Sequence, residues 1–233
     1  MIVCAPDMTV DIATRLGVEP CVLVVVNNRH PVSKLKILLD VGIAGAKRGV
    51  NAAIYITSAR RIKPTWAVVP DVFGDFRRTL AQWLRYAPII SRHAAPIFVA
   101  QEFYRPSILD VLLHDLRQLG VVKVALPMRQ HPDVSCASEP RLCAERAERA
   151  LRWLCGSVEH IHLLGPALKS VKMLRGVLHQ CERQDTVVSF DTSAYRRAPN
   201  QQIKRQLGGR WMPRSHEEAV AMLETWLRQA LAL

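Results

Sequence analysis

Polar residues and one glycine follow several short apolar runs of the chain, where they could carry proton transfer and hydrogen bonding. They are Asn27, Asn28, Asp40, Asp71, Asp75, Gln101, Glu102, Gly165 and Asp191. Carboxyl groups exchange protons with substrates, and amides both donate and accept hydrogen bonds. An Asp that ends a strand can instead cap the next helix. A functional site therefore requires a fold that brings several of these residues to one place.

The apolar runs that precede these residues have the length and composition of β-strands. Most of them do not alternate with polar residues, which is typical of strands buried on both faces of a parallel sheet. We expect eight strands: Val22–Val26, Ile37–Leu39, Ala53–Thr57, Trp66–Val69, Ile97–Ala100, Val121–Ala125, His160–Leu164 and Thr186–Phe190.

Segments between these runs carry apolar residues every three or four positions, which predicts amphipathic helices. The expected helices are Phe76–Tyr86, Pro106–Leu119, Arg141–Leu154, Leu168–Gln180 and His216–Leu231. Ser215 is expected to cap the last of them, ahead of Glu218. Alternating strands and helices predict an α/β fold built from right-handed βαβ units.

Eight strands in 233 residues favour a (β/α)8 barrel of the TIM type, with irregular early units. The alternative is a doubly wound open sheet, but no G-x-G-x-x-G sequence follows the first strand. We expect residues 1–233 to form a single barrel domain, with a basic loop and a C-terminal helix at 201–233. In such a barrel the C-terminal ends of the strands share one rim, which carries the active site.

The charge of the chain points to a phosphate-rich partner. Thirty-two Lys and Arg residues against twenty Asp and Glu residues give a net charge of +12, and basic domains bind polyanions by releasing counterions. An Arg-rich surface of a thermophilic or high-GC organism is the equally weighted alternative. No apolar run reaches the ~20 residues of a membrane span, and the N-terminus lacks a basic signal-peptide region. We therefore expect a cytoplasmic protein.

Six cysteines show no spacing typical of a zinc site, so no metal is expected. Free thiols are the default expectation, with Cys4, Cys21 and Cys155 in the core. Cys136 and Cys143 flank a polar loop and form the alternative pair.

Several of these segments resemble the tRNA-guanine transglycosylase superfamily, most closely its branch that inserts 7-deazaguanines into DNA. The resemblance covers roughly residues 35–198. It is carried by Ile37-Leu38-Leu39-Asp40-Val41-Gly42, by Trp66 to Asp75 with its Pro70-Asp71-Val72 core, by Ile97 to Gln101, by His162-Leu163-Leu164-Gly165 and by Val188-Ser189-Phe190-Asp191-Thr192-Ser193. The last of these, followed by Tyr195-Arg196-Arg197, is the most specific.

The resemblance implies an enzyme that exchanges a guanine-like base in DNA or tRNA without a cofactor. Asp191 then corresponds to the nucleophile that attacks the sugar C1′, and Asp40 to the general acid and base. Such a carboxylate pair supports double displacement. Asp71 and Gln101 correspond to residues that bind the purine edge, and Asp75 and Gly165 join them as substrate-binding candidates.

Basic residues beside the expected nucleophile are candidates for holding nucleic-acid phosphates. They are Arg196, Arg197, Lys204, Arg205 and Arg210. An ordinary solvated face is the equally weighted alternative. A homodimer or a partner subunit is left open.

Two sequence features favour other functions. After Asp40 the family has Ser-Gly-Gly-Phe, whereas this chain has Val41-Gly42-Ile43-Ala44. The zinc-binding cysteines of the tRNA enzymes are also missing. A non-catalytic nucleic-acid-binding barrel is therefore one alternative, and a small-molecule barrel enzyme that uses an Asp pair is another.

Two further expectations concern the surroundings of Asp191. One of His160 and His162 is expected to face the barrel interior, most simply as a core histidine. The donors expected to hold the Asp191 carboxylate are Ser189, Thr192, Ser193 and Tyr195.

Overall fold

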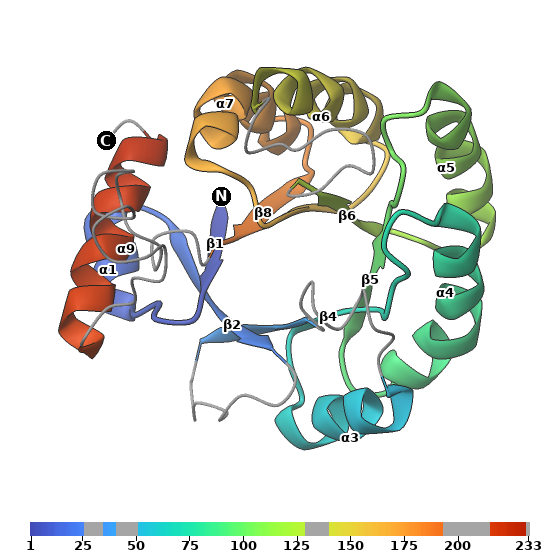
Figure 1. Cartoon of the computed structure of the whole chain (residues 1–233), viewed down its shortest axis with the longest axis horizontal. Coiled ribbons are helices and arrows are strands. Elements are labelled where there is room, and N and C mark those ends of the chain that lie inside the picture. Colours follow the sequence, from blue (N-terminus) through green and yellow to red (C-terminus); the bar gives the residue numbers. More distant parts are fainter. Residues whose placement is uncertain (26–34, 41–50, 129–139, 193–214, 232–233) are drawn as a thin grey trace, which may run out of the picture.

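Eight short strands form a closed, all-parallel barrel in chain order, and helices lie outside it (Figure 1). The computed structural model describes residues 1–25, 35–40, 51–128, 140–192 and 215–231. Its strands are β1 (Ile2–Ala5), β2 (Glu19–Val25), β3 (Lys36–Asp40), β4 (Trp66–Val68), β5 (Ala95–Val99), β6 (Lys123–Pro127), β7 (His160–Leu164) and β8 (Val187–Asp191). The predicted (β/α)8 barrel is confirmed.

The described helices alternate with these strands. They are α1 (Val10–Leu16), α3 (Ala52–Ile62), α4 (Phe76–Ile90), α5 (Pro106–Gln118), α6 (Pro140–Leu154), α7 (Leu168–Glu182) and α9 (His216–Leu231). Each sequence-predicted helix is present, and α9 has the predicted bounds. The Ser215 hydroxyl accepts a hydrogen bond from the Glu218 N–H at 3.2 Å, as expected of the cap. In Figure 1, α9 (red) lies beside α1 (blue).

The first and last strands close the barrel. β1 pairs with β8 in parallel, so that Ile2 lies opposite Ser189 and Cys4 opposite Asp191. β1 also pairs with β2, with Cys4 opposite Cys21. β8 therefore lies between β1, which comes first in the chain, and β7, which directly precedes it.

Side chains along each strand alternate between the barrel interior and the helices. The inner layer is a small apolar cluster from six of the strands: Ile2, Cys4, Cys21, Leu23, Leu38, Trp66, Val68, Ile97, Val99 and Ala125. The residues between them, such as Val3, Leu39 and Phe98, belong to a larger cluster that includes the buried faces of the helices. This alternation tells which strand residues can reach a site inside the barrel.

One predicted strand is wrong and one strand was missed. Ala53–Thr57 lies within α3, because Asn51 caps a helix there and accepts hydrogen bonds from the N–H groups of Ala53 and Ile54 at 3.1 and 3.4 Å. Tyr55, Ser58 and Ala59 are the buried residues of this helix, at the three- and four-residue spacing of one helix face. The missing strand is β1, whose four residues the sequence analysis left unassigned.

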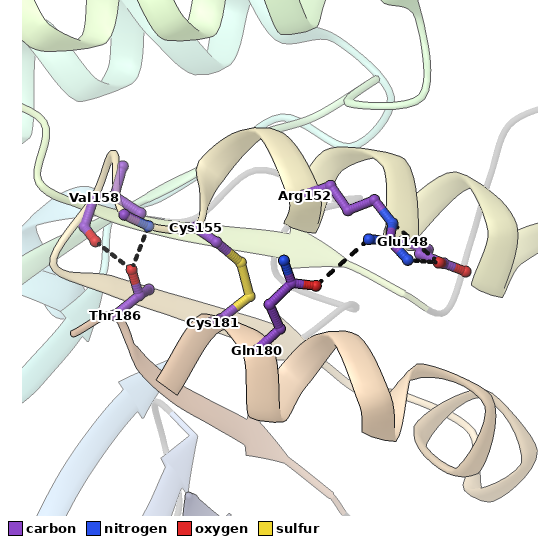
Figure 2. The surroundings of a disulfide bond; sticks show 8 residues. Glu148, Arg152, Cys155, Val158, Gln180, Cys181 and Thr186 are labelled. Carbon is purple, nitrogen blue, oxygen red and sulfur yellow. Dashed lines mark hydrogen bonds and ion pairs between the residues drawn. A yellow bond between two sulfur atoms is a disulfide. The ribbon is translucent and has the colours of Figure 1, made fainter. Parts of the chain in front are cut away.

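The expectation of free thiols is wrong for Cys143, Cys155 and Cys181, which are disulfide-bonded. Cys155 and Cys181 bond to each other, with Cα atoms 4.8 Å apart. Figure 2 shows that this bond links the end of α6 to α7. Cys155 was assigned to the core from its apolar neighbours in sequence, but the packing of α6 against α7 brings it to Cys181. Cys4 and Cys21 are free and buried, as expected. Cys136, of the alternative pair, lies outside the described residues.

Among the described residues, no helix is both long enough and apolar enough to cross a membrane.

Candidate active site at the C-terminal ends of the strands

Asp191 ends β8 and faces the barrel interior. Its neighbours Val188 and Phe190 belong to the outer cluster that packs on the helices, so alternation turns Ser189 and Asp191 inward. The Asp191 side chain is largely buried, and its Oδ1 accepts a hydrogen bond from the Gly165 N–H at 2.5 Å. Gly165 directly follows β7 and has φ of 57°, a left-handed conformation that favours glycine.

Two buried histidines lie beneath Asp191 on the neighbouring strand. Because Ile161 and Leu163 belong to the outer cluster, His160 and His162 both face the interior. The Ser189 Oγ lies 2.6 Å from His160 Nε2 and 2.7 Å from His162 Nδ1. The other ring nitrogen of His162, Nε2, lies 3.4 Å from Asp191 Oδ1. The expectation that only one histidine faces inward is wrong, because residues two apart on a strand share a face.

Two donors lie near Asp191 that the sequence analysis did not name. Gly165 and His162, both from the β7 region, lie at the carboxylate, whereas the Ser189 hydroxyl bridges the two histidine rings. Thr192 is buried and donates its backbone N–H to the Cys4 carbonyl oxygen at 2.9 Å. Ser193 and Tyr195 lie outside the described residues.

Charges around the histidine pair oppose protonation of the deeper ring. Burial lowers the pKa of His160 to about 3, and the neighbouring His162, Lys123 and Lys36 act in the same direction. The His160 ring also meets the edge of Trp66, with centroids 5.1 Å apart. His160 is therefore a neutral ring at physiological pH.

Asp71 and Gln101 follow β4 and β5 and contact each other. Gln101 Nε2 donates to Asp71 Oδ2 at 2.6 Å, and Gln101 Oε1 accepts from the Gly74 N–H at 3.0 Å. Burial raises the pKa of Asp71, although the hydrogen bond from Gln101 acts in the opposite direction. Asp71 and Gln101 are therefore held together by a direct hydrogen bond.

Asp40 ends β3, where its partner on β2 is Val25. Leu38 on the same strand faces the interior, so alternation places Asp40 on the inner face. A fully buried tyrosine lies nearby: Tyr55 donates its hydroxyl to the Val68 carbonyl oxygen at 2.5 Å, with the Leu39 carbonyl oxygen 3.3 Å away. Burial raises the pKa of Tyr55 well above its ordinary value, and the charges of Asp40 and Asp71 raise it further.

Tyr55 was missed at the sequence level because its segment was predicted to be a strand. A signal for it was available, since Asn51 followed by Ala52-Ala53 is a typical helix start. The tyrosine fixes the ends of β3 and β4 beside the two carboxyl groups.

Two other candidates make hydrogen bonds within the chain. Asp75 is the N-cap of α4, and its Oδ1 accepts from the Arg78 N–H at 2.9 Å. This is the capping role that the sequence analysis gave as an alternative. The backbone N–H of Gly165 donates to the Asp191 carboxylate.

The site residues thus form two groups on one rim. Asp40, Asp71 and Gln101 lie at the C-terminal ends of β3 to β5, with Tyr55 of α3 beside them. Asp191 and Gly165 lie at the C-terminal ends of β8 and β7, and the histidine pair lies deeper in the barrel. The basic candidates Arg196, Arg197, Lys204, Arg205 and Arg210 lie outside the described residues. Within the part of the chain that is described, no cluster of His, Cys, Asp or Glu is arranged to hold a metal.

Comparison with known proteins adds no family assignment, since no protein-family model and no curated protein matches the chain.

Proposed function

We propose that the chain is a glycosyl transferase that exchanges a guanine-like base in nucleic acid through a covalent Asp191 intermediate. The observation that carries this proposal is the setting of Asp191: an inward carboxylate at the end of the last strand, with Oδ1 held by the Gly165 N–H. Because Oδ1 is the anchored oxygen, the attack on the sugar is assigned to Oδ2. A carboxylate fixed in this way is poised for nucleophilic catalysis.

The proposed reaction consists of two displacements. In the first, Asp191 Oδ2 forms a bond to C1′ while the bond from C1′ to the base breaks, and Asp40 gives its proton to the leaving base. In the second, the entering base loses a proton to Asp40 and attacks C1′, which releases the Asp191 carboxylate. The same carboxyl group serves as acid and then as base.

Recognition of the base is assigned to Asp71 and Gln101. One N–H of the Gln101 amide already binds Asp71, and its carbonyl oxygen is held by the Gly74 N–H. These contacts fix both side chains before a ligand arrives. The second amide N–H and the Asp71 carboxyl oxygens match the mixed acceptors and donors of a guanine edge.

Support for a nucleic-acid substrate comes from where the basic residues fall in the sequence. Segments 26–34, 41–50 and 193–214 directly follow β2, β3 and β8 and carry two, two and six Lys or Arg residues, with no Asp or Glu. All three segments therefore begin near the rim of the barrel at which Asp40 and Asp191 lie. Positive charge at this rim would hold phosphates beside the reacting sugar.

The test is exchange of labelled guanine into duplex DNA and into tRNA, with the wild type, Asp191→Asn and Asp40→Asn. Asp191→Asn keeps the shape but lacks the anionic nucleophile, so we expect exchange to fall by several orders of magnitude while polymer binding survives. Asp110→Asn, on the exposed face of α5, is the matched control and should exchange like the wild type.

Each outcome of this assay decides between the functions considered. Wild-type exchange by Asp191→Asn would refute the covalent mechanism. A wild type that binds the polymer without exchange would favour the binding-only barrel. No binding of either polymer at low salt would favour a small-molecule enzyme.

A further inference from the structure

A chain of buried polar groups runs from the barrel interior to Asp191. It consists of His160, Ser189, His162 and Asp191, whose exposed fractions are 2%, 0%, 0% and 8%. Ser189 Oγ contacts one nitrogen of each ring. The two remaining ring nitrogens, His160 Nδ1 and His162 Nε2, are buried without a hydrogen bond in the structure. Buried nitrogens without partners are costly, so this arrangement needs an explanation.

The serine hydroxyl has a single proton, so with neutral rings it donates to one histidine and accepts from the other. In the first arrangement His160 Nε2–H donates to Ser189, and Ser189 donates to His162 Nδ1. The proton of His162 then sits on Nε2, facing Asp191 Oδ1 at 3.4 Å. In the second arrangement every hydrogen bond is reversed, and the bare lone pair of His162 Nε2 faces the carboxylate.

The surroundings favour the first arrangement. The second would place two acceptors against each other at Asp191 and would also put the His160 proton on Nδ1, where it has no acceptor. The first leaves only an unused lone pair on His160, which costs less than a buried donor without a partner. The charged groups facing His160 are Lys36 and Lys123, from β3 and β6, and both oppose a positive charge on its ring. Cys4, opposite Asp191 on β1, is buried as a thiol.

We propose that His162 is a positioning residue for Asp191, held in its Nε2–H tautomer by Ser189 and His160. The 3.4 Å separation shortens to a hydrogen bond when substrate is bound, because catalytic hydrogen bonds are often long before the ligand arrives. Gly165 and His162 then both donate to Oδ1, so that the second oxygen, Oδ2, is turned toward the sugar. No proton changes place in this role, since His162 only donates a hydrogen bond.

This inference rests on the proposed function for its kinetic consequence, but its structural core can be tested without activity. Nitrogen-15 NMR of the histidine side chains reports the tautomer of each ring at pH 7. We expect the Nε2–H form for both His160 and His162 in the wild type. In Ser189→Ala the fixed tautomer of His162 should be lost, whereas Ser189→Thr keeps the hydroxyl and should preserve it. A wild-type His162 that is protonated on Nδ1, alone or together with Nε2, would overturn the proposal.

Kinetics of base exchange provide the second readout. His162→Gln can place an amide donor near the position of Nε2, whereas His162→Asn leaves a polar group near Nδ1 and no donor at Asp191. We expect kcat to fall about ten- to a hundredfold in His162→Asn with KM little changed, and to be largely retained in His162→Gln. His114→Gln, on the exposed face of α5, is the control.

The two proposals fail in different ways. Equal loss in His162→Gln and His162→Asn, with both variants folded, would reduce His162 to a packing residue and overturn its positioning role. If the wild type itself shows no exchange, the proposed function fails, and the NMR tautomers still decide whether His162 donates to Asp191.

Discussion

The buried His160 ring makes the free energy of unfolding depend on pH. Its pKa is about 3 in the folded chain against an ordinary value of 6.5, because burial and the nearby His162, Lys123 and Lys36 oppose its protonation. The unfolded chain therefore binds a proton that the folded chain does not. The contribution of the neutral His160 ring to the free energy of unfolding is fully present above pH 6.5. It is lost as the pH falls from there toward 3, with a slope of up to about 1.4 kcal/mol per pH unit.

Urea unfolding at pH 7 and pH 5 measures this contribution. Other groups also titrate in this range, so the informative quantity is the difference between wild type and His160→Gln. We expect the wild type to lose up to about 2 kcal/mol more than the variant over this interval. His114→Gln, an exposed histidine, should behave like the wild type. Equal losses in wild type and His160→Gln would show that the ring is protonated without cost.

At the residue scale, part of the site was accessible from the sequence. Side chains two residues apart on a strand share a face, so Ser189 and Asp191 can be predicted to face the same side of β8. The same rule places His160 and His162 together on one face of β7. The Gly165 contact was not accessible, since it depends on the register between β7 and β8 and on a left-handed backbone. The contacts of Tyr55 with β3 and β4 were not predicted, because its segment was assigned to a strand.

At the scale of elements, the long helices and the central strands follow from hydrophobic periodicity, whereas short elements do not. α4 to α7 and α9 each span several turns, so their apolar stripes are unambiguous. β1 has only four residues, and the first turns of α3 are rich in β-branched and aromatic residues that are typical of strands. In both places packing in the barrel, which periodicity does not report, decides the structure.

The Cys155–Cys181 disulfide is an element-scale feature, since it links α6 to α7 across 26 residues of sequence. In Figure 2 the same pair of helices is also linked by Arg152, which binds Glu148 on its own helix and contacts Gln180 on α7 at 3.4 Å. Closing a loop of this length restricts the unfolded chain by an amount worth about 2–4 kcal/mol. Reduction should therefore lower the free energy of unfolding, because it releases this restriction on the unfolded chain.

Unfolding with and without a reductant tests this prediction in the wild type and in Cys155→Ala/Cys181→Ala. We expect the reductant to lower the free energy of unfolding of the wild type by about 2–4 kcal/mol and to affect the double variant much less. The double variant controls for any other effect of the reductant. An equal response of the two proteins would contradict a stabilising role for this disulfide.

At the scale of the whole molecule, many Lys and Arg residues of the sequence fall in segments that follow strand C-termini. At the N-terminal ends of the strands, a cavity of about 390 Å³ is lined by Glu19, Glu182 and Asp185 together with Lys36. Composition alone predicted a basic protein, whereas the barrel topology identifies the strand ends that the basic segments follow.

Salt dependence of DNA or tRNA binding tests the proposed role of the basic segments. We expect affinity to fall steeply with salt, and Arg196→Ala/Arg197→Ala to reduce the slope by about two phosphate contacts. Arg60→Ala/Arg61→Ala, in the last turn of α3, removes the same charge at the opposite end and should leave the slope unchanged. An affinity that does not respond to salt would argue against a nucleic-acid substrate.

The pairing of β1 with β8 also determines at which stage of folding the candidate site forms. Asp191 lies opposite Cys4, so the carboxylate is placed only when the N-terminal strand meets a strand from near the other end of the chain. Contacts between such distant residues form late, because a long loop must close first. A chain emerging from the ribosome therefore does not have the Asp191 carboxylate in position until β8 is released and the barrel closes. If the proposed function holds, base exchange should appear together with global folding, and partly synthesised chains should show none.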